Sequence, residues 1–130
     1  MASDDFYTIK GYTIHSEGNV TSAMEDYLEM IARISFAGGR ARVKGLSAKL
    51  HVKASSVTKM VSQLAKENLV NAHRSGEVEL TETGKQLGEY LLYRHDVLHD
   101  FYRLLNGTEN ELEQVEKTEH FFNERTIRNL

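Results

Sequence analysis

The chain has 130 residues, of which 40% are apolar and 27% charged, enough for one domain with a modest core but not for two independent ones. No apolar run approaches the ~20 residues of a membrane-spanning helix, and Met1 precedes Ala-Ser-Asp-Asp instead of a basic and then apolar leader, so we expect a soluble cytosolic protein. The absence of cysteine excludes disulfides, thiolate metal sites and cysteine nucleophiles. Any metal must therefore be held by oxygen and nitrogen ligands.

The net charge of −3 hides an uneven distribution. Residues 33–66 hold eight basic residues and no acid, whereas residues 1–32 hold one basic residue and six acids, and residues 96–124 hold two and eight. A basic block on an acidic body indicates local contact with a polyanion such as nucleic acid, because phosphate binding depends on local charge. A solvated basic face would have the same pattern.

In chain order, residues 1–20 are polar and are predicted to form an arm or a short extended segment. Ser22 followed by Glu25 has the form of a capping box, and helical apolar spacing then predicts a helix over residues 22–36. Gly38-Gly39 ends it, and a short helix is expected over residues 43–50. After the link at residues 51–53, a third helix is predicted with the buried stripe Val57, Met60, Val61 and Leu64.

Beyond Asn68 the apolar period changes to two, which predicts a small hairpin over residues 70–80. A long helix is expected from about Thr83 to Leu105, ended by Asn106-Gly107. Thr108 with Glu111 predicts the start of a fifth helix that continues through residues 116–120. Asn123 is a plausible cap for a last turn or two that ends at Leu130.

This order of helix, short helix, tight link, helix and hairpin is that of a winged helix-turn-helix, and it coincides with the basic block. The N-terminal half of the third helix would enter the major groove, and the hairpin tip would meet the adjacent backbone. A similar domain used for protein contacts is the alternative. The predicted DNA-contacting residues are Arg42, Ser55, Ser56, Thr58, Lys59, His73 and Arg74.

Acids and histidines share faces of three predicted helices: Asp26 and Glu29 on the first, His95 on the fourth, and Glu116, Glu119 and His120 on the fifth. Stacked acids repel one another by ~4 kcal/mol for a pair ~4 Å apart at an effective dielectric constant of ~20, and a cation would relieve this. Four carboxylates and two neutral imidazoles sum to −4, the charge that two divalent ions would neutralise. An oxygen-rich set with imidazole suits Mn²⁺, with Fe²⁺ as the alternative.

Solvated acids and structural histidines are the simpler interpretation of these patterns. A second cluster competes with the first, since His95 and His99 lie one helical turn apart, with Asp96 and Asp100 beside them. Spacing alone does not choose between the two clusters.

Five motifs appear in order, and together they cover about residues 21–128: residues 24–29 (MEDYLE), 55–61 (SSVTKMV), 80–85 (LTETGK), 93–95 (YRH) and 116–120 (EKTEH). In this combination the sequence resembles the manganese transport regulator branch of the diphtheria-toxin-repressor family. The resemblance implies a mainly α fold with a small β-hairpin wing. It also implies a winged helix-turn-helix DNA-binding domain over residues 21–82, followed by a helical metal-binding and dimerisation domain over residues 83–130.

Carried over position by position, the resemblance implies a paired manganese site, with two ions per subunit, held by Asp26, Glu29, His95, Glu116, Glu119 and His120. Iron-responsive relatives have methionine where Asp26 stands and cysteine where Glu116 stands, so these two residues favour manganese over iron. The implied function is that of a cytosolic homodimer, without catalytic activity, which represses metal-uptake genes at palindromic operators when metal is bound. Leu112, Val115, Phe121 and Phe122 are expected to supply its dimer contacts.

Three other functions compete with this one. An iron-responsive repressor of the same family would differ in its metal. A winged-helix regulator could instead sense an organic effector. A di-metal hydrolase could use the same ligands to hold a nucleophile, although the chain is short for a pocket-forming fold.

Overall fold

The computed structural model describes residues 20–130, so the predicted N-terminal arm lies outside the described residues except for Val20. In that part of the chain no helix is long and apolar enough to cross a membrane. The elements follow in the order α2 (Ser22–Phe36), β1 (Ala41–Arg42), α3 (Val43–Leu50), α4 (Ala54–Lys66), β2 (Val70–Ala72), β3 (Glu77–Leu80), α5 (Glu82–Asn106), α6 (Leu112–Thr118), the 3₁₀ turn η2 (Glu119–Phe121) and α7 (Glu124–Asn129).

The first part of this order, from α2 to β3, is a winged helix, as predicted. β2 and β3 form the expected hairpin, and Val70 pairs with Leu80 in antiparallel register. The two-residue strand β1 adds to the other edge of β3, which gives the sheet order β1-β3-β2. The sequence analysis missed β1 because two residues are too few to show a period of two.

Two apolar clusters hold the described chain together. The larger cluster joins α2, α3, α4, the sheet and the first half of α5, and it includes the predicted stripe residues Val57, Val61 and Leu64. The smaller cluster is formed by Leu98, Tyr102, Val115 and Ile127 from α5, α6 and α7. Since α5 contributes to both clusters, it is the element that connects the winged helix to the C-terminal helices; the division at residue 82 stays a prediction.

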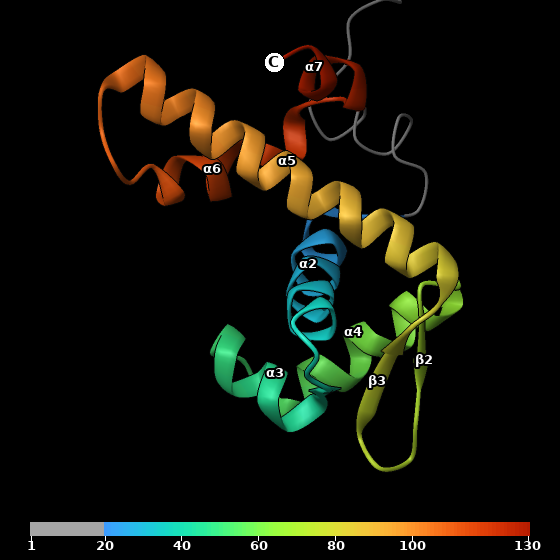
Figure 1. Cartoon of the computed structure of the whole chain (residues 1–130). Helices are drawn as coiled ribbons and strands as arrows, with labels where there is room; N and C mark the ends of the chain where they lie inside the picture. Colours follow the sequence, from blue (N-terminus) through green and yellow to red (C-terminus); the bar gives the residue numbers. More distant parts are fainter. Residues whose placement is uncertain (1–19) are drawn as a thin grey trace, which may run out of the picture.

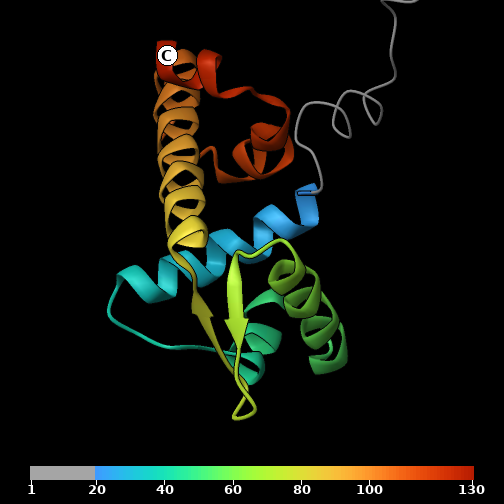
Figure 2. The same cartoon turned by 90° about the vertical axis from the view of Figure 1, so that its right-hand side faces the viewer.

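The wing and α4 lie at the end of the molecule opposite to α6 and α7, and α2 lies between these two ends (Figures 1 and 2). α2 crosses α5 and also packs against α4. The crossing with α5 is close: a Cβ built on Gly88 would lie 2.7 Å from the Cβ of Ala32. Residues on the N-terminal half of α2 thereby face the middle of α5.

Helix ends were predicted with mixed success. The N-cap of α2 is Thr21, whose hydroxyl accepts from the Met24 amide at 3.2 Å, so the capping box at Ser22 was wrong by one residue. Its expected partner, Glu25, is buried against α5 and the C-terminal segment instead. Gly107 ends α5 in the left-handed region with φ 65°, and Asn123 caps α7; both agree with the prediction.

The predicted fifth helix was wrong in both its start and its continuity. It begins at Leu112, and the Thr108 hydroxyl donates to the Glu111 carboxylate at 2.7 Å in the preceding loop without capping a helix there. The helix ends at Thr118, whose hydroxyl bonds to the Gln114 carbonyl and to the hydroxyl of Tyr102 on α5. The chain then tightens into η2 over the residues that the sequence analysis placed on one continuous helix.

The crossing at Gly88 yields a prediction on stability. Gly88→Ala should lower the free energy of unfolding by about 1–3 kcal/mol, because the added methyl group overpacks the contact with Ala32. Gly45→Ala in α3 is the matched control: its Cβ would meet nothing within 4 Å, so the change should be neutral or stabilising by about 0.5–1 kcal/mol. Urea denaturation of both variants measures the difference, and equal stabilities would contradict the close crossing.

Candidate metal centre and nucleic-acid interface

All six residues of the predicted metal site lie together where α2, α5, α6 and η2 meet. They form two groups, and within each group one nitrogen or carboxylate oxygen per residue lies within 4.8 Å of the others. Glu119 belongs to both groups. The first group is Glu29, His95, Glu116 and Glu119, and the second is Asp26, Glu119 and His120.

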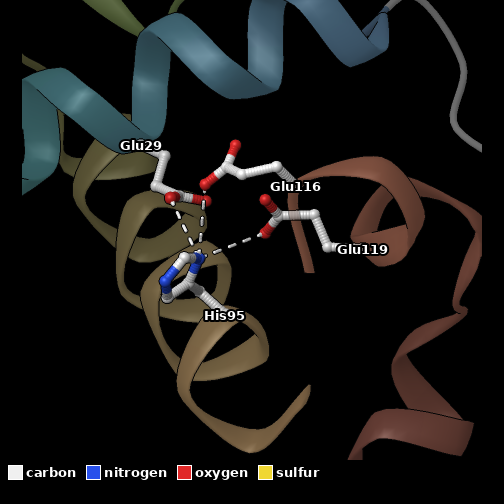
Figure 3. A group of neighbouring side chains, drawn as sticks. All are labelled: Glu29, His95, Glu116 and Glu119. Carbon is white, nitrogen blue, oxygen red and sulfur yellow. Dashed lines mark ion pairs between the residues drawn. The ribbon is translucent and has the colours of Figure 1, made fainter. Parts of the chain in front are cut away.

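In the first group the imidazole of His95 faces three carboxylates, which reach it from three different elements (Figure 3). His95 Nδ1 lies 3.6 Å from an oxygen of Glu29, 3.8 Å from Glu116 and 3.9 Å from Glu119. These separations exceed ordinary hydrogen-bond lengths, so the four side chains surround a common point without bonding tightly to one another. That is the arrangement expected of ligands around a cation.

Glu119 provides the strongest evidence that a cation belongs here. Its side chain is 0% exposed, and neither carboxylate oxygen has a hydrogen-bond partner. His95 Nδ1 is likewise buried and unpartnered. Burying an ionised carboxylate without partners costs several kcal/mol, and a bound metal ion offsets this cost. The residues present therefore fit a divalent cation.

The side chains around His120 in the second group lie closer together than those of the first group. His120 Nε2 lies 2.9 Å from an oxygen of Asp26, while the opposite ring nitrogen, Nδ1, donates to Glu25 at 2.8 Å. The guanidinium of Arg94 lies 3.1 Å from that same Glu25 oxygen and 3.8 Å from Glu119. Around the first group, the guanidinium of Arg33 lies 3.3 Å from Glu29. Arginines thus stand beside the carboxylates on both sides.

The shifted pKa values reflect this crowding of acids. Burial, together with the charges of Glu119 and Glu116, raises the pKa of Glu29 to about 7, and burial beside Glu119 also raises that of Glu116. Burial alone would lower the pKa of His120, but Asp26 and Glu25 outweigh it and raise the pKa to about 10. At neutral pH the ring of His120 therefore carries two protons, and a metal ion must displace the one on Nε2.

The competing cluster around His99 does not assemble. The Nε2 atom of His99 accepts from the Glu111 amide at 3.1 Å at the start of α6, and Asp96 and Asp100 are exposed. In the described residues neither acid belongs to a group that could hold a metal. The role of His99 is to fix the loop before α6.

Sequence analysis missed two buried residues beside the predicted ligands, Glu25 and Arg94. Both occupy positions in apolar stripes: Glu25 precedes Leu28 by three residues, and Arg94 follows Leu91 by three. A charged side chain at such a position must be paired, because an isolated buried charge is too costly. This is the signal that could have found them.

The predicted DNA-contacting residues all lie exposed on β1, the first half of α4 and the wing; they are Arg42, Ser55, Ser56, Thr58, Lys59, His73 and Arg74. Two of them already have partners. The Thr58 hydroxyl donates to the Ala54 carbonyl at 3.1 Å, and His73 Nε2 lies 3.8 Å from Glu79. Both interactions would have to change or be shared if these side chains contact DNA.

The expected dimer residues differ in their environments. Leu112 and Phe121 are exposed, whereas Phe122 is half-buried and Val115 is 0% exposed inside the smaller cluster. Val115 was therefore misassigned, since it packs against α5 within its own chain. Leu104 and Leu105 at the end of α5 are exposed instead.

Comparison with known proteins gives the family of this chain. Residues 19–78 match the family described as iron dependent repressor, N-terminal DNA binding domain. The HTH-type transcriptional regulator MntR of Oceanobacillus iheyensis is 37% identical over 108 residues, which cover 82% of this chain and 74% of that protein.

Two solved structures share the fold. The manganese regulator SloR is 30% identical, with a TM-score of 0.70 over 82% of this chain, and T. acidophilum IdeR is 25% identical, with a TM-score of 0.66 over 81%. In both cases the chain spans 50% of the length of the solved chain.

The unpartnered carboxylate of Glu119 yields a prediction on metal binding. Mn²⁺ at one hundred times its dissociation constant should stabilise the wild-type protein by about 2.7 kcal/mol. Glu119→Gln should lose most of this gain, because the side chain common to both groups no longer carries charge. Without metal, the melting temperature of this variant should be no lower than that of the wild type, because the unpartnered buried carboxylate is gone. Calorimetry with and without Mn²⁺ measures both effects.

Glu113→Gln is the matched control for this experiment. Glu113 is an exposed acid on α6 whose only described partner is Lys117 at 2.8 Å, so the same change of charge there should preserve the response to Mn²⁺. An undiminished response in Glu119→Gln would remove this residue from the metal centre.

Proposed function

Since this chain belongs to the manganese transport regulator branch of the diphtheria-toxin-repressor family, whose members are metal-dependent transcriptional repressors and not enzymes, we propose that Mn²⁺ is its corepressor. Its targets would be palindromic operators of metal-uptake genes, which it binds as a homodimer. A repressor acts where the DNA is, so the proposal places it in the cytoplasm. Family membership also removes the hydrolase from consideration.

The observation that carries the proposal of a metal corepressor is the shared, buried and unpartnered carboxylate of Glu119. Asp26, Glu29, His95, Glu116, Glu119 and His120 would hold up to two ions. A bound Mn²⁺ supplies positive charge and positions for oxygen and nitrogen ligands, and this donor set of four carboxylates and two imidazoles suits it better than a thiophilic metal. Fe²⁺ remains the alternative, since it accepts the same donors.

The proposed switch depends on α2. Its N-terminal half carries Asp26 and Glu29, and its core-facing residues pack in the larger cluster with the recognition helix α4. When these acids are held together with those of α6 and η2, α2 is fixed against α5. Without a cation the acids repel one another, and α2 is held less firmly. The orientation of α4 in the winged helix thereby depends on the metal centre.

DNA binding and dimerisation complete the proposal. The exposed polar side chains at the start of α4 would read the major groove, and Arg74 on the wing would contact the backbone. The exposed Leu104, Leu105, Leu112 and Phe121 on the helical domain, proposed as residues 83–130, would form the two-fold contact. Two recognition helices ~34 Å apart match half-sites one DNA turn apart.

Substitutions of Asp26 test the choice of metal. Asp26→Ala should sever the Mn²⁺ dependence of DNA binding, and Asp26→Met should shift selectivity towards Fe²⁺, because a soft neutral ligand replaces a hard anion. Mobility shift on a metal-transporter promoter fragment with Mn²⁺, anaerobic Fe²⁺, Zn²⁺ or chelator measures this. Asp96→Ala, an exposed acid of the competing cluster, should respond like the wild type.

Two results would contradict the proposal. Mn²⁺ dependence that persists in Asp26→Ala would reject the assigned site. DNA binding by the wild type that is equally strong with chelator would instead favour regulation by an organic effector.

Substitution of Lys59 tests whether the first half of α4 contacts DNA. If its ammonium group contacts a phosphate, Lys59→Ala should reduce the slope of log K against log salt by about one unit in magnitude, whereas a base contact would mainly relax sequence preference. Lys66→Ala is the control, because this exposed lysine ends the same helix, away from its N-terminal half. Identical affinity, slope and preference in Lys59→Ala and the wild type would remove Lys59 from the interface.

A further inference from the structure

Two buried charged residues beside the metal centre are not among its ligands. Glu25 on α2 is 6% exposed and Arg94 on α5 is 2% exposed, and they form an ion pair at 3.1 Å. Replacing a buried ion pair with apolar side chains of similar volume is often neutral or stabilising, so fold stability alone is a weak reason for this pair. Its position next to the ligands suggests another role.

Glu25 sets the orientation of His120. The two ring nitrogens of His120 face opposite carboxylates: Nδ1–H donates to Glu25 at 2.8 Å, and Nε2 points to Asp26 at 2.9 Å. An acceptor fixed at Nδ1 keeps the proton on that nitrogen, so that the proton a metal ion displaces is the one on Nε2. Glu25 therefore determines both the rotation of the ring and which of its nitrogens can act as a ligand.

Arg94 controls the charge of the same region. One guanidinium nitrogen of Arg94 lies 3.1 Å from Glu25, 3.3 Å from Nδ1 of His120 and 3.8 Å from Glu119. A guanidinium cannot accept a hydrogen bond, so Glu25 is the acceptor for Nδ1–H. Paired with Glu25, Arg94 neutralises the negative charge that Glu25 adds, so the pair does not change the net charge around the ligands. Without Glu25, its nearest remaining carboxylate is Glu119, a residue of both ligand groups.

We propose that Glu25 and Arg94 are positioning residues of the metal centre. Glu25 presents Nε2 of His120 to the metal, and the ion pair between Glu25 and Arg94 keeps Arg94 from pairing with Glu119. The inference rests on the proposed function, since it assumes that a divalent cation binds this centre. It adds two residues that act through ligands and do not themselves touch the metal.

The test compares variants that have equal charge. Glu25→Gln/Arg94→Met removes both charges and keeps a carbonyl oxygen that can accept from Nδ1–H, whereas Glu25→Leu/Arg94→Met removes both charges and the acceptor. Mn²⁺ affinity is measured by titration calorimetry on the DNA-free protein. The variant with leucine should bind at least about 10-fold more weakly than the variant with glutamine. Circular dichroism establishes that both are folded.

The single variant Glu25→Gln tests the role of Arg94. With Arg94 free to pair with Glu119, Mn²⁺ should bind more weakly than in Glu25→Gln/Arg94→Met, so removal of the arginine should restore affinity. A pair that only holds the fold together, without acting on the charge at the metal centre, predicts no such rescue. Glu113→Gln, the exposed acid on α6, should bind like the wild type.

A spectroscopic readout follows the ring itself. In ¹⁵N-histidine spectra of the Zn²⁺-loaded wild type, His120 should show a protonated Nδ1 and a metal-bound Nε2, and this pattern should be lost in Glu25→Leu/Arg94→Met. Equal Mn²⁺ affinities and the same ring pattern in the two double variants would overturn the inference. A wild-type protein that binds no Mn²⁺ would instead overturn the proposed function.

Discussion

The carboxylate of Glu119 sits at the centre of the four elements that carry the proposed metal ligands. It is completely buried, its oxygens lack hydrogen-bond partners, and it lies where α2, α5 and η2 meet. An unpartnered carboxylate in such a place is costly, and Arg94 at 3.8 Å offsets this cost only in part. The helices around Glu119 therefore pack best when a further cation is bound.

In the proposed switch, two helices connect the metal centre to the DNA-binding helices. α5 contributes Leu91 to the larger apolar cluster and Leu98 to the smaller one, so it is a common support for both halves. α2 crosses it at Gly88 and Ala32, one helical turn from Glu29. α2 also packs against α4, and because packed helices do not deform continuously, a change at the acids of α2 would be transmitted to α4.

Local sequence patterns predicted most of the winged helix because its elements depend on local physics. Apolar periodicity located α2, α3 and α4, the change to a period of two located the hairpin, and Gly107 and Asn123 marked helix ends correctly. The patterns failed where a tertiary contact decided the outcome. Thr118 bonds to Tyr102 and the chain turns into η2 there, a contact between elements that apolar spacing does not reveal.

The six candidate ligands of the metal centre could be named from the residues alone, since their identities and their match to a known family are properties of the chain. Spacing could not decide between His99 and the acids of α2, because helical periodicity relates residues within one helix only. The tertiary structure decided this by turning His99 to the Glu111 amide and bringing four elements around Glu119. It alone revealed Glu25 and Arg94 as a buried pair, because burial is set by which helix faces meet.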